Sequence, residues 1–332
     1  MVKAFVFGKF LPFHKGHEGM INFALTKCDF LTVLICCSDK ENILSETRKN
    51  WIETTFNSSQ KIEVRVFNYL EDELPNTSVS SVDVSKIWSK RFKEIFPDYK
   101  LVVTSEKYGD YVASFMDIKH ISYDIPKQFY PVSATNIRND IFSNWKFLPK
   151  SVKSYFAIKI VILGTESTGK STLCENLSKH FNCSMVKEAG RDLIANSSSF
   201  DFNDLNLVAN EHAKRIDLEL DGNSPLIIID TDIHTTMSYA NFIFNKELKV
   251  NNSIHNSNKA DLYLYLNNDV EYIQDGTRLS ETKRNLLDLS HRNILKEKKV
   301  PVVNISGDWE TRFNKAKEHI NNILAIKENT YR

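Results

Sequence analysis

Short apolar runs separated by amphipathic stretches repeat along the chain. A short apolar run bounded by polar residues predicts a buried strand, and apolar residues recurring every three or four positions predict a helix. By this pattern we expect strands at residues 4–7, 31–37, 62–67 and 101–104. We expect helices at residues 16–27, 45–56 and 84–96 and another starting near Ser133 or Thr135. Ser45 is expected to cap the second of these helices.

The same pattern restarts after residues 149–155, a stretch with a proline and several lysines and serines. Residues 245–258, rich in asparagine and lysine, are expected to form an exposed loop. Alternating strands and helices predict a parallel sheet covered by helices. We therefore expect an α/β chain of two doubly wound parallel-sheet domains, residues 1–152 and 153–332. In the second domain, strands are expected at residues 158–163, 185–186, 226–229, 262–266 and 302–305, and helices at 170–181, 205–220, 234–244, 281–298 and 309–326.

Composition narrows the class of protein. The chain has 332 residues, enough for two separate cores, with 42% hydrophobic and 26% charged residues, which is typical of a folded soluble protein. A net charge of +1 argues against a dedicated nucleic-acid surface. Five cysteines without a CxxC pair favour a reducing compartment over a disulfide framework. Without a signal peptide or a membrane-length apolar run, we expect a cytoplasmic protein with no membrane and no nucleic-acid partner.

The first candidate site is the segment Gly-Lys-Phe-Leu-Pro-Phe-His-Lys-Gly-His at residues 8–17, between the first strand and its helix. Doubly wound sheets bind ligands at this place, and a helix N-terminus favours phosphate. Gly8 lets the backbone approach a nucleotide, and Lys9, His14 and His17 supply donors to phosphate oxygens. These residues suit attack of a substrate phosphate on the α-phosphorus of ATP. Such a reaction needs alignment and charge stabilisation but no catalytic base.

The second candidate site is a P-loop, Gly-Thr-Glu-Ser-Thr-Gly-Lys-Ser at residues 164–171, between an expected strand and an expected helix. Its backbone N–H groups would cradle phosphates, Lys170 would reach the β- and γ-phosphates, and Ser171 would ligate Mg²⁺. The segment predicts an ATP-binding, phosphoryl-transferring site. The expected nucleotide-binding residues are Gly164, Thr165, Glu166, Ser167, Thr168, Gly169, Lys170, Ser171 and Thr172.

Acidic and basic residues elsewhere in the second half fit a kinase. Asp230 and Asp232 follow an apolar strand, where a carboxylate commonly ligates the metal beside a P-loop, although either could cap the next helix instead. Glu188 is a candidate base for the substrate hydroxyl, and Arg191 follows it. Arg278 lies in a polar stretch and is expected to act from a lid on the transferring phosphoryl group. Whether Glu188, Asp230 or Asp232 is the base stays open.

Two segments of the first half resemble the nucleotidyltransferase superfamily. Residues 8–17 resemble its GxFxPxHxGH signature, and Ser-Ala-Thr-Asn-Ile-Arg at residues 133–138 resembles its SxTxxR motif. The resemblance implies that Ser133 and Thr135 cap a helix at the nucleotide and that Arg138 holds the ATP phosphates. The Gly-Lys-Phe opening is similar to that of the superfamily branch that makes NAD. We count Phe10 among the expected nucleotide-binding residues. Trp88 is then a candidate to stack on a pyridine ring, with packing in the core as the competing interpretation.

The order of the two sites resembles the bifunctional nicotinamide mononucleotide adenylyltransferase/ribosylnicotinamide kinase family of the NadR type. The resemblance implies phosphorylation of nicotinamide riboside to the mononucleotide and adenylylation of the mononucleotide to NAD, both with ATP and Mg²⁺. It also implies that Arg191 and Asp232 bind substrate, that Asp230 ligates the metal with Ser171, and that the protein is a homo-oligomer. Some members begin with a DNA-binding helix-turn-helix domain, which is not expected here because the first strand starts near Met1.

Three other functions stay open. A fused phosphopantetheine adenylyltransferase and dephospho-coenzyme A kinase has the same modules in the same order, but that family tends to carry a small hydroxyl residue in place of Lys9. A sulfurylase fused to an adenylylsulfate kinase is a more distant candidate. A protein that senses NAD or ATP with little turnover would be expected to lack phosphate-contacting residues, and those residues are present here.

Overall fold

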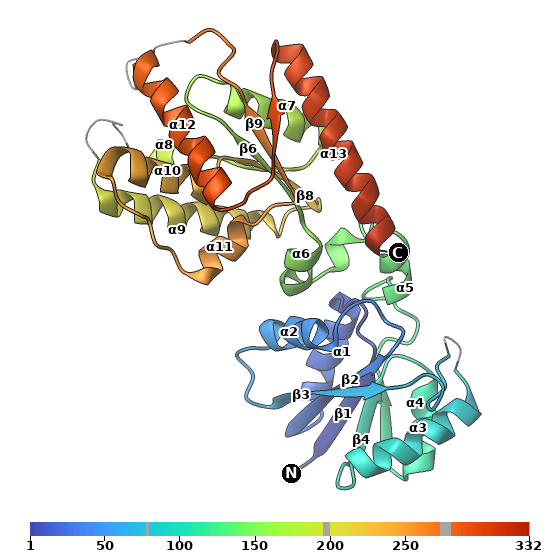
Figure 1. Cartoon of the computed structure of the whole chain (residues 1–332). Coiled ribbons are helices and arrows are strands. Elements are labelled where there is room, and N and C mark those ends of the chain that lie inside the picture. Colours follow the sequence, from blue (N-terminus) through green and yellow to red (C-terminus); the bar gives the residue numbers. More distant parts are fainter. Residues whose placement is uncertain (78–79, 195–199, 273–279, 332) are drawn as a thin grey trace. The chain divides into compact units, whose positions relative to one another are not determined.

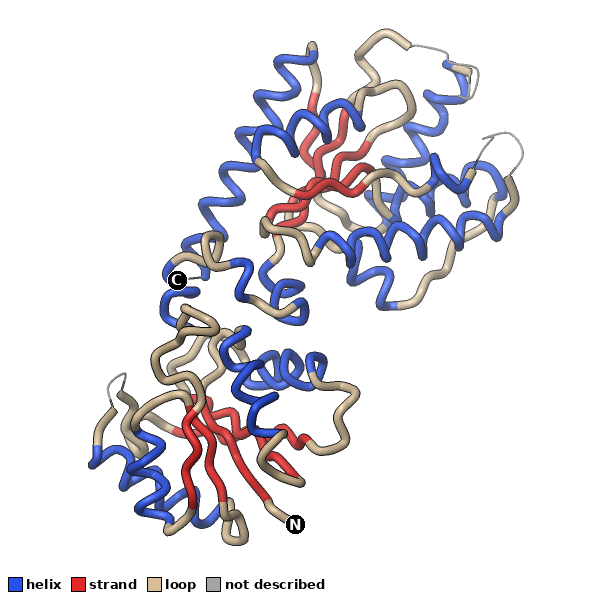
Figure 2. The backbone as a smooth tube through the Cα atoms, turned by 180° about the vertical axis from the view of Figure 1, so that it is seen from behind, coloured by secondary structure: helices blue, strands red, loops and turns tan. Residues whose placement is uncertain are grey.

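The chain forms two compact units, Met1–Tyr155 and Phe156–Arg332, and the division falls inside helix α6 (Lys150–Phe156). The structure, a computed structural model, describes residues 1–77, 80–194, 200–272 and 280–331 (Figure 1). Every strand pairing that it describes is parallel. Helices lie on both sides of the strands in each unit (Figure 2). The expected α/β class with two doubly wound parallel sheets is confirmed.

The first unit is built on a five-stranded sheet of order β3-β2-β1-β4-β5. Its central strand β1 is buried along its middle and ends at Gly8, so the first candidate site opens at the carboxyl edge of the sheet. Aromatic rings fill one face of this sheet, where Phe5 stacks on Phe96 with ring centroids 4.3 Å apart. The strands are β1 (Lys3–Gly8), β2 (Phe30–Ser38), β3 (Ile62–Tyr69), β4 (Leu101–Thr104) and β5 (Lys119–Ser122). The helices are α1 (Lys15–Leu25), α2 (Ser45–Thr55), α3 (Val82–Ile95), α4 (Tyr108–Met116), α5 (Ala134–Asn139), the 3₁₀ turn η1 (Trp145–Phe147) and α6.

The second unit has a five-stranded sheet of order β10-β9-β6-β8-β7. The central strand β6 leads directly into the P-loop, and its neighbour β8 ends at Asp230, so the loop and the carboxylate meet at one edge. The strands are β6 (Ile158–Leu163), β7 (Ser184–Val186), β8 (Leu226–Asp230), β9 (Leu262–Leu266) and β10 (Val302–Ile305). The helices are α7 (Lys170–Phe181), α8 (Gly190–Leu193), α9 (Phe202–Glu219), α10 (Ile233–Phe244), α11 (Asn252–Asn258), α12 (Glu281–Glu297) and α13 (Trp309–Tyr331).

Two local expectations are wrong. Residues 245–258 are not a loop throughout, because α11 forms within them and buries Ile254 and Asn258. Ser45 does not cap α2, since the N-cap residue is Leu44 and no side chain caps the helix. Residues 149–155, where the boundary between the domains was expected, carry most of α6. Among the described residues, no helix combines the length and apolar character needed to cross a bilayer.

Candidate functional site

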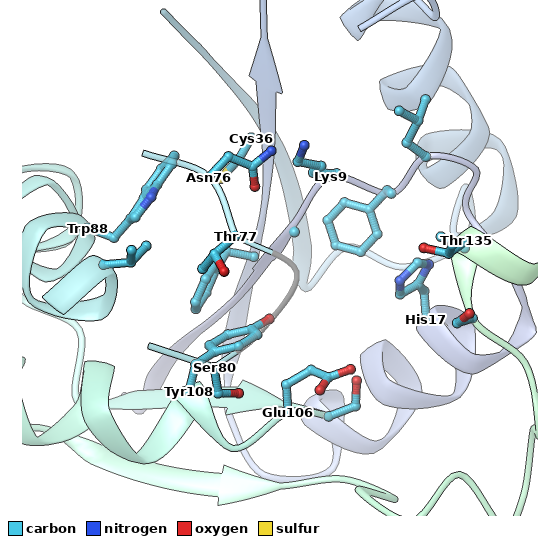
Figure 3. A pocket seen from close by; sticks show the side chains of 18 of the residues that line it. Lys9, His17, Cys36, Asn76, Thr77, Ser80, Trp88, Glu106, Tyr108 and Thr135 are labelled. Atoms are coloured by element: carbon cyan, nitrogen blue, oxygen red, sulfur yellow. The ribbon is translucent and has the colours of Figure 1, made fainter. Parts of the chain in front are cut away.

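A cavity of ≈ 480 Å³ lies over the carboxyl edge of the first sheet (Figure 3). It is lined by residues of the loop after β1, of α1, of α3 and of the start of α5. All the side chains proposed from sequence for adenylyl transfer therefore meet in one place. They are Gly8, Lys9, Phe10, His14, His17, Trp88, Ser133, Thr135 and Arg138.

His14 and His17 form a stacked pair at the start of α1, with ring centroids 3.7 Å apart. His14 is the N-cap residue, and its Nδ1 accepts a hydrogen bond from the Gly16 N–H at 3.1 Å. Burial, helped by the charge of Lys127, lowers the pKa of His14 to about 3. Burial and the neighbouring His14 also hold the pKa of His17 well below its usual value. Both rings are thus neutral at pH 7, and His14 carries its proton on Nε2, where it can donate to a ligand.

Gly8 and Gly16 shape this histidine site. A Cβ at Gly16 would lie 3.0 Å from the His14 ring, so the absence of a side chain lets that ring fold over the helix terminus. A Cβ at Gly8 would meet only the Phe10 ring, at 3.7 Å, so Gly8 leaves room inside the cavity. Phe10 itself is buried and packs edge-on against His17, with ring centroids 4.9 Å apart. Phe10 therefore supports the histidine as well as lining the cavity.

Lys9 is held by a buried ion network that sequence reasoning missed. Its Nζ lies 3.0 Å from Glu41 Oε1, and the other oxygen of Glu41 lies 2.6 Å from Arg48 Nη1. Arg48 is only 1% exposed and donates to the backbone carbonyls of Lys9 and Ile43. This network fixes both the backbone and the ammonium of Lys9. No short sequence pattern marks this network, because Arg48 is 39 residues from Lys9.

The SxTxxR-like segment forms the start of α5. Ser133 is the N-cap residue, and its Oγ accepts from the Asn136 N–H at 3.1 Å. Arg138, one turn later, donates to the Leu11 carbonyl and to Thr135 Oγ1. Arg138 thereby joins α5 to the loop after β1, and its guanidinium lies at the cavity wall. Burial lowers the pKa of the Arg138 guanidinium.

Trp88 lies where both interpretations drawn from the sequence, core packing and a place in the cavity, apply to it. It packs in the core against Tyr69, with ring centroids 4.9 Å apart, and its indole N–H donates to the Pro75 carbonyl at 3.0 Å. It also lines the cavity, at the end where Asn76 and Thr77 follow β3 (Figure 3). Sequence reasoning missed this polar loop, although its place after a strand end was a signal. Other lining residues not foreseen are Ser80, Glu106, Tyr108 and Lys127.

The P-loop has the backbone that phosphate binding requires. Gly164 and Gly169 have φ values of +140° and +83°, and a Cβ at Gly164 would lie 2.7 Å from the Leu266 carbonyl oxygen. Only glycine meets both demands easily. Lys170 is the first residue of α7, and its Nζ donates to the Thr165 carbonyl at 2.9 Å. The ammonium of Lys170 is thus bound to the backbone of its own loop, at a carbonyl that a phosphate oxygen could replace as its hydrogen-bond partner.

Ser171 and Asp230 meet through a short hydrogen bond from Ser171 Oγ to Asp230 Oδ2. Asp230 is 2% exposed, and its Oδ1 is buried without a hydrogen-bond partner among the described residues. Burial raises the pKa of Asp230, while Lys170 opposes that shift. A hydroxyl and a carboxylate oxygen fit Mg²⁺, which uses few protein ligands and completes its shell with water and phosphate. Within the described residues no cluster of three His, Cys, Asp or Glu forms a protein-only cage.

A second cavity, of ≈ 360 Å³, adjoins the P-loop. Lys170, Glu188, Arg191 and Asp232 all line it, as sequence reasoning proposed for a substrate site. Glu188 accepts from Arg191 Nε at 3.0 Å. Asp232 is the N-cap residue of α10, and it accepts hydrogen bonds from the backbone N–H and the ring of His234. Of the two roles that the sequence left open for Asp232, its contacts are those of a helix cap. The lining residues that were not foreseen include Tyr239 and His291. Thr172 is the third residue of α7, while Arg278 lies outside the described residues.

Comparison with known proteins covers both units. Residues 159–312 match the family described as AAA domain. The "Trifunctional NAD biosynthesis/regulator protein NadR" of Escherichia coli K12 is 27% identical over 342 residues, which cover 96% of this chain and 82% of that protein. The protein of the same name from Salmonella typhimurium LT2 is 26% identical, with the same coverage.

Two solved structures share the fold along nearly the whole chain. The crystal structure of NadR protein in complex with NR has a TM-score of 0.64 and 19% identity, and covers 97% of this chain and 96% of that one. The structure of NadR protein in complex with NAD and AMP-PNP has a TM-score of 0.62 and 18% identity over the same shares. With sequence similarity that runs through both units and a fold that matches both, the chain is a relative of the NadR-type proteins.

Proposed function

We propose that this protein is a two-site enzyme of NAD synthesis, which phosphorylates nicotinamide riboside and adenylylates nicotinamide mononucleotide. The observation that carries the proposal is the presence of one polar cavity in each unit, the second beside a P-loop, in a chain that is similar to NadR over 96% of its length. We assign adenylyl transfer to the first unit and phosphoryl transfer to the second. Both use ATP. A cytoplasmic homo-oligomer without a nucleic-acid partner is part of the same proposal.

In the first cavity, the phosphate of the mononucleotide attacks the α-phosphorus of ATP, and pyrophosphate leaves. The neutral His14 and His17 donate N–H groups to the phosphate oxygens, and the cations of Lys9 and Arg138 balance their charge. Because Glu41 and Arg48 fix Lys9, little reorganisation is needed when the triphosphate arrives. Gly8 leaves room for the nucleotide, and Trp88 offers a face to the pyridine ring.

In the second cavity, a hydroxyl of the riboside attacks the γ-phosphorus of ATP, and ADP leaves. We assign proton removal to Glu188, because Asp230 is bound to Ser171 and Asp232 caps α10. Lys170 stabilises the charge on the transferring group, with Arg191 at the cavity wall. Ser171 and Asp230 would hold Mg²⁺, which when bound neutralises phosphate charge and orients the β- and γ-oxygens. We propose that Arg278 adds a further positive charge to this site.

The test is incubation of the purified protein with Mg–ATP and nicotinamide riboside, followed by chromatography of the products. We expect the mononucleotide to appear first and NAD afterwards. Parallel reactions start from the mononucleotide, from phosphopantetheine and from dephospho-coenzyme A. Products from the last two substrates but not from the pyridine compounds would replace this proposal with coenzyme A synthesis. NAD binding without any product would indicate a sensor.

A further inference from the structure

The loop between β5 and α5 packs against α1, the helix that begins at the histidine pair. A Cβ at Gly19 of α1 would lie 2.5 Å from the Tyr123 hydroxyl oxygen and 2.9 Å from the Tyr130 ring. Both ends of the loop therefore meet α1 at the same position. Lys127 lies between the two tyrosines, and it lines the ≈ 480 Å³ cavity together with the histidine pair.

Asp124 holds this loop in its conformation. Its carboxylate accepts hydrogen bonds from the backbone N–H groups of Gln128 at 2.7 Å and of Phe129 at 3.0 Å. Its backbone carbonyl accepts from the Lys127 N–H at 2.8 Å, and Lys127 has a φ of +54°, in the left-handed region. The hydrogen bonds of the loop thus set the place from which the Lys127 side chain reaches the cavity.

Lys127 has a carboxylate partner at the same cavity. Its Nζ lies 3.5 Å from Glu106 Oε1, and the two side chains are 40% and 47% exposed. Glu106 lines the cavity from the loop after β4 (Figure 3). An ion pair as exposed as this one is weak, so a phosphate with more negative charge can replace Glu106 as the partner of Lys127. Glu106 and the phosphate would then compete for one ammonium.

The charges around the cavity show why a further cation is useful there. Burial keeps both rings of the histidine pair uncharged, so their N–H groups offer hydrogen bonds to phosphate but no net charge. The ammonium of Lys9 is shared between Glu41 at 3.0 Å and Glu71 at 4.0 Å. A triphosphate carries several negative charges, which enzymes offset with cations placed beside it.

Lys127 lies at the histidine end of the cavity, because its loop packs on α1. Its charge adds to the lowering of the pKa values of both histidines. Trp88, the candidate partner of the pyridine ring, lies on the opposite side of the cavity from His17 (Figure 3). A mononucleotide with its ring at Trp88 leaves the histidine end, and with it Lys127, to the triphosphate.

We propose that Lys127 binds the triphosphate of ATP in the first cavity and the pyrophosphate that leaves from it, with Glu106 as the competing charge that holds Lys127 when no nucleotide is bound. This inference rests on the proposed adenylylation of nicotinamide mononucleotide. It predicts opposite effects for the two partners, because loss of the cation weakens phosphate binding and loss of the carboxylate strengthens it.

The test measures both directions of the reaction. In the forward direction the mononucleotide and Mg–ATP give NAD. In the reverse direction pyrophosphate attacks the adenylyl phosphorus of NAD and the mononucleotide leaves, which gives ATP. The variants are K127M, K127R and E106Q, with K107M as the control. Lys107 adjoins Glu106 in sequence but is exposed and lies outside the cavity, so K107M makes the same charge change nearby.

We expect K127M to raise KM for ATP and for pyrophosphate by roughly 5- to 20-fold, because it removes a charge-assisted contact at a partly exposed site. E106Q should lower both values by about two- to threefold. K127R keeps the cation and should stay within about threefold of the wild type, which K107M should match. KM for the mononucleotide should change by less than about twofold in every variant, and riboside phosphorylation should not change.

Equal effects of K127M and K107M would overturn the inference, because net charge alone would then explain them. A rise in KM for the mononucleotide without a rise for pyrophosphate would overturn it as well, since Lys127 would then bind the other phosphate. A higher KM for pyrophosphate in E106Q would contradict the competition between Glu106 and phosphate. A wild type that forms neither NAD in the forward direction nor ATP in the reverse direction would instead overturn the proposed function of the first unit.

Discussion

At the scale of single residues, His14 caps α1 through an unprotonated ring nitrogen, and we propose that its other nitrogen donates to phosphate. Its Nδ1 accepts the Gly16 N–H as the cap of α1, and its opposite nitrogen can donate to a phosphate. Protonation of Nδ1 would remove the acceptor and add a positive charge beside the exposed N–H groups of the helix terminus. Burial prevents this by holding the pKa at about 3.

This lowered pKa predicts a pH dependence of stability. Between pH 6.5 and about 3 the unfolded chain protonates this histidine and the folded chain does not, so stability falls as the pH falls through that window. The contribution of His14 to the free energy of unfolding is fully present above pH 6.5. At pH 5 this contribution is about 2 kcal/mol smaller. In His14→Asn, asparagine can still cap the helix but does not titrate. We expect the variant to lose less stability than the wild type between pH 7.5 and pH 5.

Urea unfolding at the two pH values measures this difference. Tryptophan fluorescence reports mainly on the first unit, because Trp51, Trp88 and Trp145 lie there and only Trp309 lies in the second. Equal pH dependence in the variant and the wild type would show that His14 titrates normally in the folded protein. His17 is present in both proteins, but His14 contributes to lowering its pKa, so the measured difference reports the two histidines together.

At the scale of elements, the sequence predicts the buried strands and long helices and misses several of the short elements. The central strands β1 and β6 are apolar runs and were expected nearly at their observed bounds. Strand β5, Lys-His-Ile-Ser, pairs only with β4 at the edge of its sheet and has no buried residue, so no apolar pattern marks it. Helix α4 begins four residues after β4 and was not expected.

Some residues of the candidate sites could be predicted from the sequence and others could not. His14, His17 and Lys170 could be predicted, because each lies in a contiguous motif in which a strand, a loop and a helix follow one another. Contacts between distant segments are set by the fold and have no local signal. Such contacts are the pairing of Arg48 with Glu41 under Lys9 and that of Tyr239 with Glu166. The roles proposed for these residues stay predictions.

Helix α11 shows how tertiary contacts override a polar composition. Asn258, at its end, is 1% exposed; its Oδ1 accepts from the Ile233 N–H at 3.1 Å and its Nδ2 donates to the Ile254 carbonyl. Asn258→Ala would leave the N–H at the start of α10 buried without its acceptor. We expect the second unit to lose about 1–3 kcal/mol of stability. Asn256→Ala, at an exposed position of the same helix, should be nearly neutral. Thermal unfolding of both variants measures this, and similar midpoints would contradict the structural role of Asn258.

At the scale of the whole molecule, each unit has its own sheet and its own cavity. All the cavity residues assigned to adenylyl transfer belong to Met1–Tyr155, and those assigned to phosphoryl transfer belong to Phe156–Arg332. Among the residues that the structure describes, neither cavity is lined by a residue of the other unit. The two reactions are therefore expected to fail separately when single residues are changed.

Lys170→Ala should lower riboside phosphorylation by on the order of 100-fold or more and leave NAD formation from the mononucleotide unchanged. His17→Ala should do the reverse. Arg138→Ala should give the same result as His17→Ala without a change in the packing of His17 against Phe10.

Each variant is assayed from the riboside and from the mononucleotide, with the mononucleotide quantified in both reactions. From the riboside, the His17 and Arg138 variants should accumulate mononucleotide, because its production continues while its consumption stops. Loss of both reactions in a folded Lys170→Ala protein would mean that the first site depends on the second, and the separation of function between the units would then have to be given up.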